Sequence, residues 1–133
     1  MASYWCRGNQ GLKVIIDTNA LMIPFQFNVD IFEELERLGY HTHLVPTSVI
    51  RELDTLVKSL KGGNRVAARV ARTMAKRCEV VHADGHADDV IFELATEMSA
   101  SVLTNDIELR KRLEQENITV VGLRQKNRLE IIS

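Results

Sequence analysis

Cysteine, proline and aromatic residues are scarce in this chain of 133 residues, which has two Cys, two Pro and 5% aromatic residues. Cys6 and Cys78 are far apart and match no metal-binding spacing, so the sequence offers neither a disulfide framework nor a cysteine zinc site. A reduced, cytoplasmic setting is therefore expected. The sequence also lacks an apolar run as long as a membrane span, and its first residues lack the apolar stretch of a secretory signal. We expect no membrane association.

Two kinds of catalytic motif are also missing. Gly62 and Gly63 precede a predicted helix, but the sequence around them lacks the pattern of a phosphate-binding loop. No serine or cysteine lies in a recognisable nucleophile elbow. His82, Asp84 and His86 alternate in one short stretch without a known zinc-hydrolase pattern, so we interpret this stretch as a polar loop.

The length and composition fit one domain with a substantial core, since 45% of the residues are hydrophobic and 26% are charged. We predict that residues 1–11 are a tail without an assigned function and that residues 12–122 form the domain. Residues 123–133 are basic and polar and are expected to form a flexible tail.

Short apolar runs alternate with stretches of helical periodicity along the domain. Strands are predicted at 12–16, 43–45, 79–81, 101–104 and 118–121, and helices at 28–38, 49–60, 64–77, 87–98 and 105–113. Asn28 is the expected N-cap of the first helix. The inner face of the third helix is expected to comprise Val66, Ala67, Val70, Ala71 and Met74. This alternation predicts an α/β fold, a three-layer α/β/α sandwich with a mainly parallel sheet of five strands.

Acidic residues recur where the predicted strands meet their helices. These residues are Asp17, Glu52, Asp88, Asp89 and Asp106. In a parallel sheet all such junctions lie at one edge, and carboxylates gathered there repel one another unless a cation neutralises them. Oxygen ligands of this kind suit Mg²⁺ or Mn²⁺.

Each acid also has a simpler interpretation. Asp106 could cap a helix, and Asp88 and Asp89 could be first-turn acids that complement the helix dipole. Glu52 could be an exposed helix residue paired with Arg51 or another neighbour. Asp17 is the hardest to dismiss, because an Asp directly after a buried strand needs a partner.

Basic residues are segregated in one stretch, although the net charge is −1. Between Asp54 and Glu79 the chain has seven basic residues and no acidic one. Four of them share one helix face: Arg65, Arg69, Arg72 and Lys76. This face indicates either an anionic partner or an ordinary solvated surface.

The order of these motifs resembles the PIN-domain ribonuclease family. The matching segments are Ile15–Asn19, Ile50–Leu53, Ala87–Ile91 and Leu103–Asp106. The resemblance covers nearly everything from Lys13 to Val121. It implies a parallel α/β/α sandwich and cleavage of RNA with Mg²⁺ or Mn²⁺ as cofactor.

Position by position, the resemblance implies catalytic and metal-binding roles for Asp17, Glu52, Asp88 and Asp106, with Asp17 and Asp88 as principal ligands. Supporting roles fall to Thr18, Asn19, Thr104 and Asp89. Asp88 is preferred to its neighbour Asp89 because Ile91 and Ala95 then turn the apolar helix face inward. RNA backbone contacts are expected from Lys61, Arg65, Arg69, Arg72, Lys76, Arg124, Lys126 and Arg128.

Two subgroups of the family fit the sequence. Archaeal and eukaryotic ribosomal-RNA processing proteins are a better match than VapC-like toxins. This holds for three segments: the residues from Asp17 to Pro24, the basic helix and the C-terminal segment. The resemblance implies protein partners of three kinds: a second copy in a homodimer, an antitoxin, or a ribosome-assembly factor. A metal-dependent endoribonuclease is the leading hypothesis. Its rivals are a non-catalytic RNA-binding assembly protein and a nuclease or phosphatase acting on DNA.

Overall fold

The computed structural model describes residues 12–133, so the predicted N-terminal tail and Cys6 lie outside the described part of the chain. Its helices are α2 (Thr18–Leu21), α3 (Ile23–Phe27), α4 (Ile31–Arg37), α5 (Thr47–Ser59), α6 (Gly62–Ala75), α7 (Ala87–Met98) and α8 (Ile107–Gln115). Its strands are β1 (Leu12–Ile16), β2 (Tyr40–Pro46), β3 (Glu79–Val81), β4 (Ser101–Leu103), β5 (Val120–Arg124) and β6 (Arg128–Ile131). No helix among these residues has the length and apolarity needed to cross a bilayer.

The strands form one sheet in the order β3-β2-β1-β4-β5-β6. Neighbouring strands from β3 to β5 run parallel, and β6 runs antiparallel to β5. The predicted α/β fold with a mainly parallel sheet is confirmed. The predicted number of five strands is wrong, because the C-terminal segment adds the sixth.

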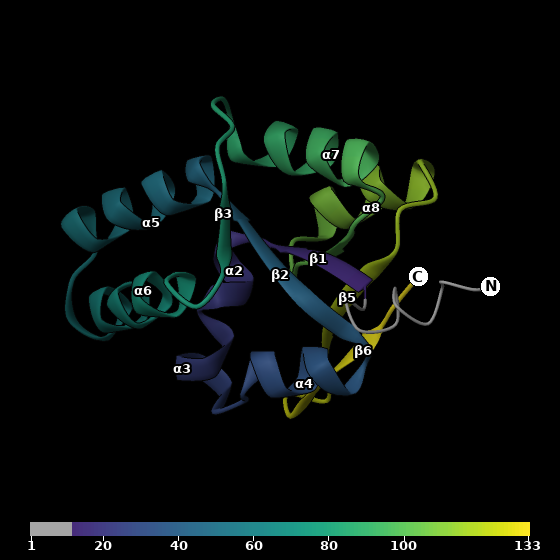
Figure 1. Cartoon of the computed structure of the whole chain (residues 1–133). Helices are drawn as coiled ribbons and strands as arrows, with labels where there is room; N and C mark the ends of the chain where they lie inside the picture. The colour runs from purple at the N-terminus through teal and green to yellow at the C-terminus, as the bar shows by residue number, and fades with distance from the viewer. Residues whose placement is uncertain (1–11) are drawn as a thin grey trace.

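The strand order creates a reversal beside β1. From β1 the chain moves through β2 to the edge strand β3, whereas from β4 it moves through β5 in the opposite direction. Because such crossovers are right-handed, the helices of the two halves lie on opposite faces. Figure 1 shows α4 below the strands, α7 above them, and α5 and α6 as a helical hairpin at one side. The carboxyl ends of β1 and β4 therefore form a topological switch point, where open sheets bind ligands.

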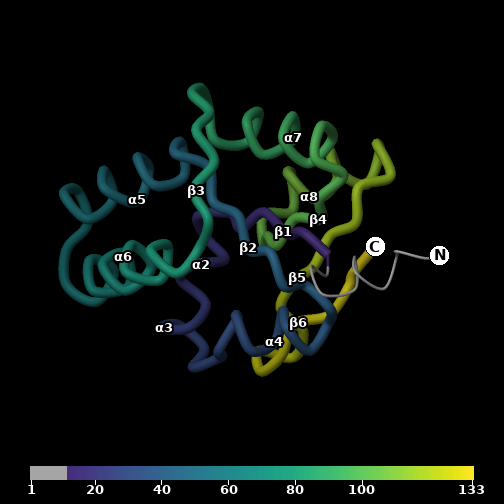
Figure 2. The backbone as a smooth tube through the Cα atoms, viewed as in Figure 1, coloured from purple at the N-terminus to yellow at the C-terminus, as the bar shows by residue number. Residues whose placement is uncertain are grey.

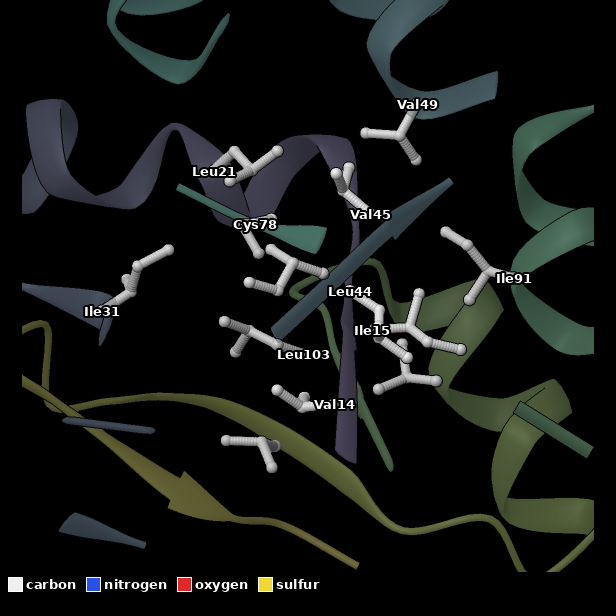
Figure 3. Packing of buried hydrophobic residues seen from close by; sticks show 14 of the residues in the cluster. Val14, Ile15, Leu21, Ile31, Leu44, Val45, Val49, Cys78, Ile91 and Leu103 are labelled. Carbon is white, nitrogen blue, oxygen red and sulfur yellow. The ribbon is translucent and has the colours of Figure 1, made fainter. Parts of the chain in front are cut away.

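The central strand β1 is buried because both of its faces are covered. Val14, Ile15 and Ile16 are completely buried, and burial of each such side chain contributes roughly 1.5–3 kcal/mol. Figure 3 shows Ile31 of α4 and Ile91 of α7 on opposite sides of these strands. This packing fixes β1 rigidly, and with it the position of the residue that follows it.

The first helical region differs from its prediction. Asn28 does not cap α4 but ends α3, with a left-handed backbone conformation at φ 55°. Asp30 caps α4 instead, accepting hydrogen bonds from the backbone N–H groups of Phe32 and Glu33. Asn and Asp are both favoured as N-caps, and Asn also occurs in the left-handed position at helix C-termini, so residue type alone did not decide between Asn28 and Asp30.

The buried face of α6 also differs from its prediction. Ala67, Ala68, Ala71 and Ala75 are buried, whereas Val66 is 46% exposed. The small alanine side chains let α6 approach the backbone of its neighbours closely, and α5 is its main partner. The sequence of α6 has two overlapping apolar faces, one with the larger valine and methionine side chains and one with alanines. The alanine face is the one that is buried.

The C-terminal segment is a structural strand, and the predicted flexible tail is wrong. Leu129 is completely buried. Its carbonyl oxygen accepts a hydrogen bond from Arg37 Nη2 at 2.8 Å, and its N–H donates to Glu34 Oε1 at 3.0 Å. Figure 2 shows β6 passing beside α4 after the turn that follows β5. Polar composition misled the prediction because only alternate residues of an edge strand are buried.

A substitution at Leu129 tests this role. Leu129→Ala should lower the free energy of unfolding by about 2–4 kcal/mol, because it leaves a cavity in a packed site. Ile131→Ala, two residues further along the same strand and 49% exposed, should change it by less than about 1 kcal/mol. Urea unfolding measures both. Equal, small effects would show that the segment does not contribute to the fold.

Candidate active site

A polar pocket of about 400 Å³ opens at the switch point. Asp17 follows β1, Glu52 lies in α5, Asp88 lies in α7 and Asp106 precedes α8. All four carboxylates line this pocket. The structure therefore brings together four acids that are separated by 89 positions between the first and the last.

Asp17 is the buried member of the set, with only 4% of its surface exposed. Its Oδ1 accepts a hydrogen bond from the Thr18 N–H at 2.8 Å, and its Oδ2 accepts one from Thr104 Oγ1 at 2.8 Å. Burial raises the pKa of Asp17 to about 6, and the nearby Asp88 and Glu52 carboxylates act in the same direction. The two hydrogen bonds oppose this rise without cancelling it.

Asp88 and Asp89 point to different surroundings, as expected for adjacent helical residues separated by about 100°. Asp88 lines the pocket, and its pKa is raised by partial burial and by Asp106 and Glu52. Asp89 does not line the pocket and forms an ion pair with Arg112 at 2.7 Å. That hydrogen bond lowers the pKa of Asp89. The geometry thus separates the two neighbours and gives Asp89 no contact with the other acids.

Glu52 and Asp106 are held by hydrogen bonds of their own. Thr18 Oγ1 donates to Glu52 Oε1, which joins α5 to the end of β1. Asp106 Oδ1 accepts from the N–H groups of Glu108 and Leu109 at 2.9 and 3.2 Å, so this residue caps α8 and also lines the pocket. The alternative pairing of Glu52 with Arg51 is not found, because Arg51 pairs with Asp84 at 2.7 Å.

The four carboxylates are near one another without forming a finished coordination shell. Within residues 12–133, no three His, Cys, Asp or Glu side chains are grouped closely enough to hold a metal ion as they stand. Asp17 and Asp106 each use one oxygen or more in hydrogen bonds, and Glu52 is bonded to Thr18. The electrostatics favour a cation, and its binding would require rotation of the more exposed acids.

The predicted supporting residues differ in their contacts. Thr104 links two acids, because its hydroxyl donates to Asp17 and accepts from the Asp106 N–H at 3.0 Å. Thr18 contacts Asp17 and Glu52, whereas Asn19 lines the pocket from an exposed position.

Sequence reasoning missed several residues that line the same pocket. Ser48 lies one helical turn before Glu52, a spacing that could have identified it. Its hydroxyl oxygen is buried and has no hydrogen-bond partner among the described residues. Arg51 contributes a cation, and His86 precedes α7 and lies close enough to lower the pKa of Asp88. His86 belongs to the stretch interpreted as a polar loop, and the interpretation gave it no place in the site.

None of the predicted RNA-binding cations lines this pocket. Several of them already have partners: Arg65 donates to the Leu60 carbonyl, Arg72 pairs with Asp54, and Arg124 and Arg128 both pair with Glu130. Lys61, Arg69, Lys76 and Lys126 are exposed and have no ion-pair partner among residues 12–133. The basic face is therefore partly occupied by intramolecular contacts.

Comparison with known proteins agrees with this arrangement. Residues 14–126 match the model of a PIN-like domain. The chain belongs to the PIN-like domain family. It is 33% identical to ribonuclease VapC9 of Archaeoglobus fulgidus over 92% of this chain and 91% of the relative. It is 36% identical to ribonuclease VapC4 of Methanocaldococcus jannaschii over 90% of this chain and 95% of the relative.

A solved structure extends the likeness to three dimensions. The structure of the PIN domain endonuclease Utp24 superposes with a TM-score of 0.73 at 25% identity and covers 90% of each chain. The family predicted from the four acidic motifs is confirmed. The similar proteins thus comprise two ribonucleases named VapC and the PIN domain endonuclease Utp24.

The raised pKa of Asp17 predicts how stability depends on pH in the metal-free PIN-like domain. The folded state binds a proton at Asp17 more tightly than the unfolded chain, so stability falls as pH rises from about 4 to about 6. A shift of this size corresponds to roughly 3 kcal/mol. Asp17→Asn should remove most of this loss and be more stable than the parent at pH 7. Urea unfolding in the presence of EDTA at several pH values measures the effect.

Asp89→Asn is the matched control for that experiment. Because the pKa of Asp89 is lowered and its side chain is exposed, this variant should retain the fall in stability between pH 4 and 6. If the parent protein became more stable across this interval, the assigned environment of Asp17 would be wrong.

Ser48 provides a separate test of the pocket. Ser48→Ala removes a buried hydroxyl without leaving a partner unsatisfied, so the free energy of unfolding should stay equal or rise by about 1 kcal/mol. If the hydroxyl is instead needed for packing, the melting temperature will fall. Thr47→Ala is the control, since Thr47 Oγ1 exchanges hydrogen bonds with Ala83 and its loss should destabilise the protein.

Proposed function

We propose that this chain is an endoribonuclease that hydrolyses RNA phosphodiesters with the help of Mg²⁺ or Mn²⁺. The observation that carries the proposal is the buried Asp17 carboxylate, surrounded by Asp88, Glu52 and Asp106 at the switch point of a PIN-like sheet. Burial of carboxylates side by side destabilises the protein, and such an arrangement is typical of sites that bind a cation.

The donor set fits a hard divalent cation. All of its members are carboxylate oxygens, which Mg²⁺ and Mn²⁺ prefer over the nitrogen and sulfur ligands typical of zinc. Asp17 and Asp88 would be the principal ligands, with Glu52 and Asp106 completing the site directly or through water. When bound, such a cation supplies charge neutralisation at the phosphate and lowers the pKa of a coordinated water.

The residues of the chain position these acids. Thr104 and the Thr18 N–H keep the Asp17 carboxylate in one orientation, and the capping bonds of Asp106 do the same for that residue. Glu52 is held by Thr18 until a ligand competes for it. The unpaired Ser48 hydroxyl is available to hydrogen-bond a water or a phosphate oxygen in the pocket. Preorganised groups of this kind reduce the reorganisation needed in the transition state.

RNA is the proposed substrate because proteins named ribonuclease VapC9 and ribonuclease VapC4 align over nearly the whole chain. The unpaired cations Lys61, Arg69 and Lys76 on or next to α6 would contact its phosphates without reading its sequence. Two settings remain proposals: processing of ribosomal RNA, which the sequence resemblance favoured, and a toxin that acts with an antitoxin, in line with the VapC names. A homodimer is compatible with either setting.

The adjacent acids provide a matched pair of variants. Asp88→Asn should reduce Mn²⁺-dependent cleavage of a structured RNA by about a hundredfold or more, because a transition-state interaction worth several kcal/mol is lost. Asp89→Asn should retain cleavage within a few-fold, because Asp89 faces Arg112 instead of the pocket. A DNA strand of the same sequence should be a poor substrate.

Metal binding is measured in the same proteins. Mn²⁺ should raise the melting temperature of the parent and of Asp89→Asn but not of Asp88→Asn, since a ligand that binds only the folded state stabilises it. Cleavage that persists in Asp88→Asn would contradict the proposed site. A parent that binds RNA but neither Mn²⁺ nor Mg²⁺ would favour the non-catalytic RNA-binding protein, and preferential cleavage of DNA would favour a DNA nuclease.

A further inference from the structure

A second cavity, of about 320 Å³, lies on the other side of the segment that joins β4 to α8. Thr104, Asn105 and Ile107 line it. Asp106, which lies between the last two in the sequence, lines the acidic pocket. One short segment therefore separates the two cavities. Thr104 also contacts Asp17 directly, so the two cavities adjoin one buried pair of side chains.

The lining of the second cavity combines apolar and cationic groups. Phe27, Ile107 and Leu123 supply the apolar surface, and Ile107 is 60% exposed. Arg110 and Lys126 supply positive charge. Lys126 has no ion-pair partner among the described residues, whereas Arg110 Nε lies 3.4 Å from Glu114 Oε2 without forming a hydrogen bond to it. The charge of the cavity is thus only partly compensated.

The turn that carries Lys126 has an unusual backbone. Gln125 and Lys126 have φ angles of 57° and 63°, in the left-handed region that favours glycine. Hairpin turns of this kind usually carry Asn and Gly at these positions. Two consecutive non-glycine residues here cost stability that a simple surface turn would not require. A functional requirement for the Lys126 side chain would explain its presence.

An aromatic ring next to cations is the combination with which proteins hold a nucleotide of a single strand. The ring stacks on a base, and the cations contact the neighbouring phosphates. The acidic pocket carries four carboxylates against one arginine, so it repels a phosphate unless a bound cation neutralises the excess negative charge. The two cavities are therefore complementary along one polynucleotide strand.

We infer that this second cavity binds the RNA nucleotide next to the scissile phosphate, with Phe27 and Ile107 against its base and Arg110 and Lys126 on its phosphates. The inference rests on the proposed function, since it assigns a subsite to the same substrate. It explains why an unpaired lysine is held in a strained turn beside the segment that carries Asp106.

The test measures binding of a short fluorescein-labelled single-stranded RNA by fluorescence anisotropy, in the Asp17→Asn protein without added metal, so that metal-dependent cleavage does not consume the RNA. Phe27→Ala should weaken binding by about five- to a hundredfold through loss of stacking. Lys126→Gln should weaken binding and reduce the slope of log affinity against log salt by about 0.7, the value of one phosphate contact on a single strand. Lys111→Gln is the matched control, because Lys111 is exposed on α8 and does not line the cavity.

A second pair of measurements separates binding from folding. Lys126→Gly should keep or raise the melting temperature, since glycine adopts the left-handed conformation freely, yet should weaken RNA binding as much as Lys126→Gln. RNAs with a single abasic residue at each position in turn should bind more weakly at one position. Phe27→Ala should be insensitive to the abasic replacement at that position, because the stacking partner is already absent.

The outcomes for the subsite and for the enzyme are distinct. If Phe27→Ala and Lys126→Gln bind as tightly as Lys111→Gln, the subsite is wrong even when Asp88→Asn abolishes cleavage. If both variants weaken binding while no cleavage depends on Asp88, the subsite stands and the proposed catalysis fails. A parent protein that does not bind RNA overturns the subsite.

Discussion

The site depends on one buried contact between two central strands. The Asp17 N–H donates to the Leu103 carbonyl at 3.0 Å, which continues the β1–β4 ladder by one residue beyond the Ile16–Leu103 pair. This register brings the Thr104 hydroxyl to the Asp17 carboxylate at 2.8 Å. A slip of one residue would turn Asp17 into the apolar core and Ile16 toward the pocket. The apolar packing of β1 therefore determines the geometry of the site.

The same constraint gives the site its electrostatic character. Asp17 is held away from solvent, because Val14, Ile15 and Ile16 before it are completely buried and the helix after it begins at the next residue. At the switch point Glu52 of α5 approaches Asp17 from one side. Asp88 of α7 and Asp106, which precedes α8, approach from the other, so the negative charges gather around Asp17. The result is a raised pKa at Asp17 and at Asp88. Ionisation of these acids therefore lowers stability, and a bound cation would offset this loss, as the proposed function requires.

Much of this could be predicted from sequence, because the relevant signals are local. Val14, Ile15 and Ile16 indicate a buried strand, and the spacing of Val90, Ile91 and Leu94 predicts α7. The preference for Asp88 over Asp89 comes from the family resemblance, which places Ile91 and Ala95 on the inner face of that helix. The errors concern interactions between distant segments. The burial of Leu129 depends on Glu34 and Arg37, which are more than 90 positions away. The alanine face of α6 depends on how closely α5 approaches, and the exposed or buried state of Ser48 depends on the pocket itself.

The distribution of charge shows why a net charge of −1 is compatible with an anionic partner. Many arginines are neutralised within the fold: Arg37, Arg51, Arg72, Arg112, Arg124 and Arg128 all have acidic partners within 4 Å. Lys61, Lys76 and Lys126 have no such partner among residues 12–133. Since paired charges of opposite sign largely cancel and salt screens exposed charges beyond about 8 Å under physiological conditions, the unpaired lysines and the acids of the pocket dominate the local field. The surface therefore presents separate cationic and anionic areas, which agrees with the proposal that a phosphate backbone binds the first and a divalent cation the second.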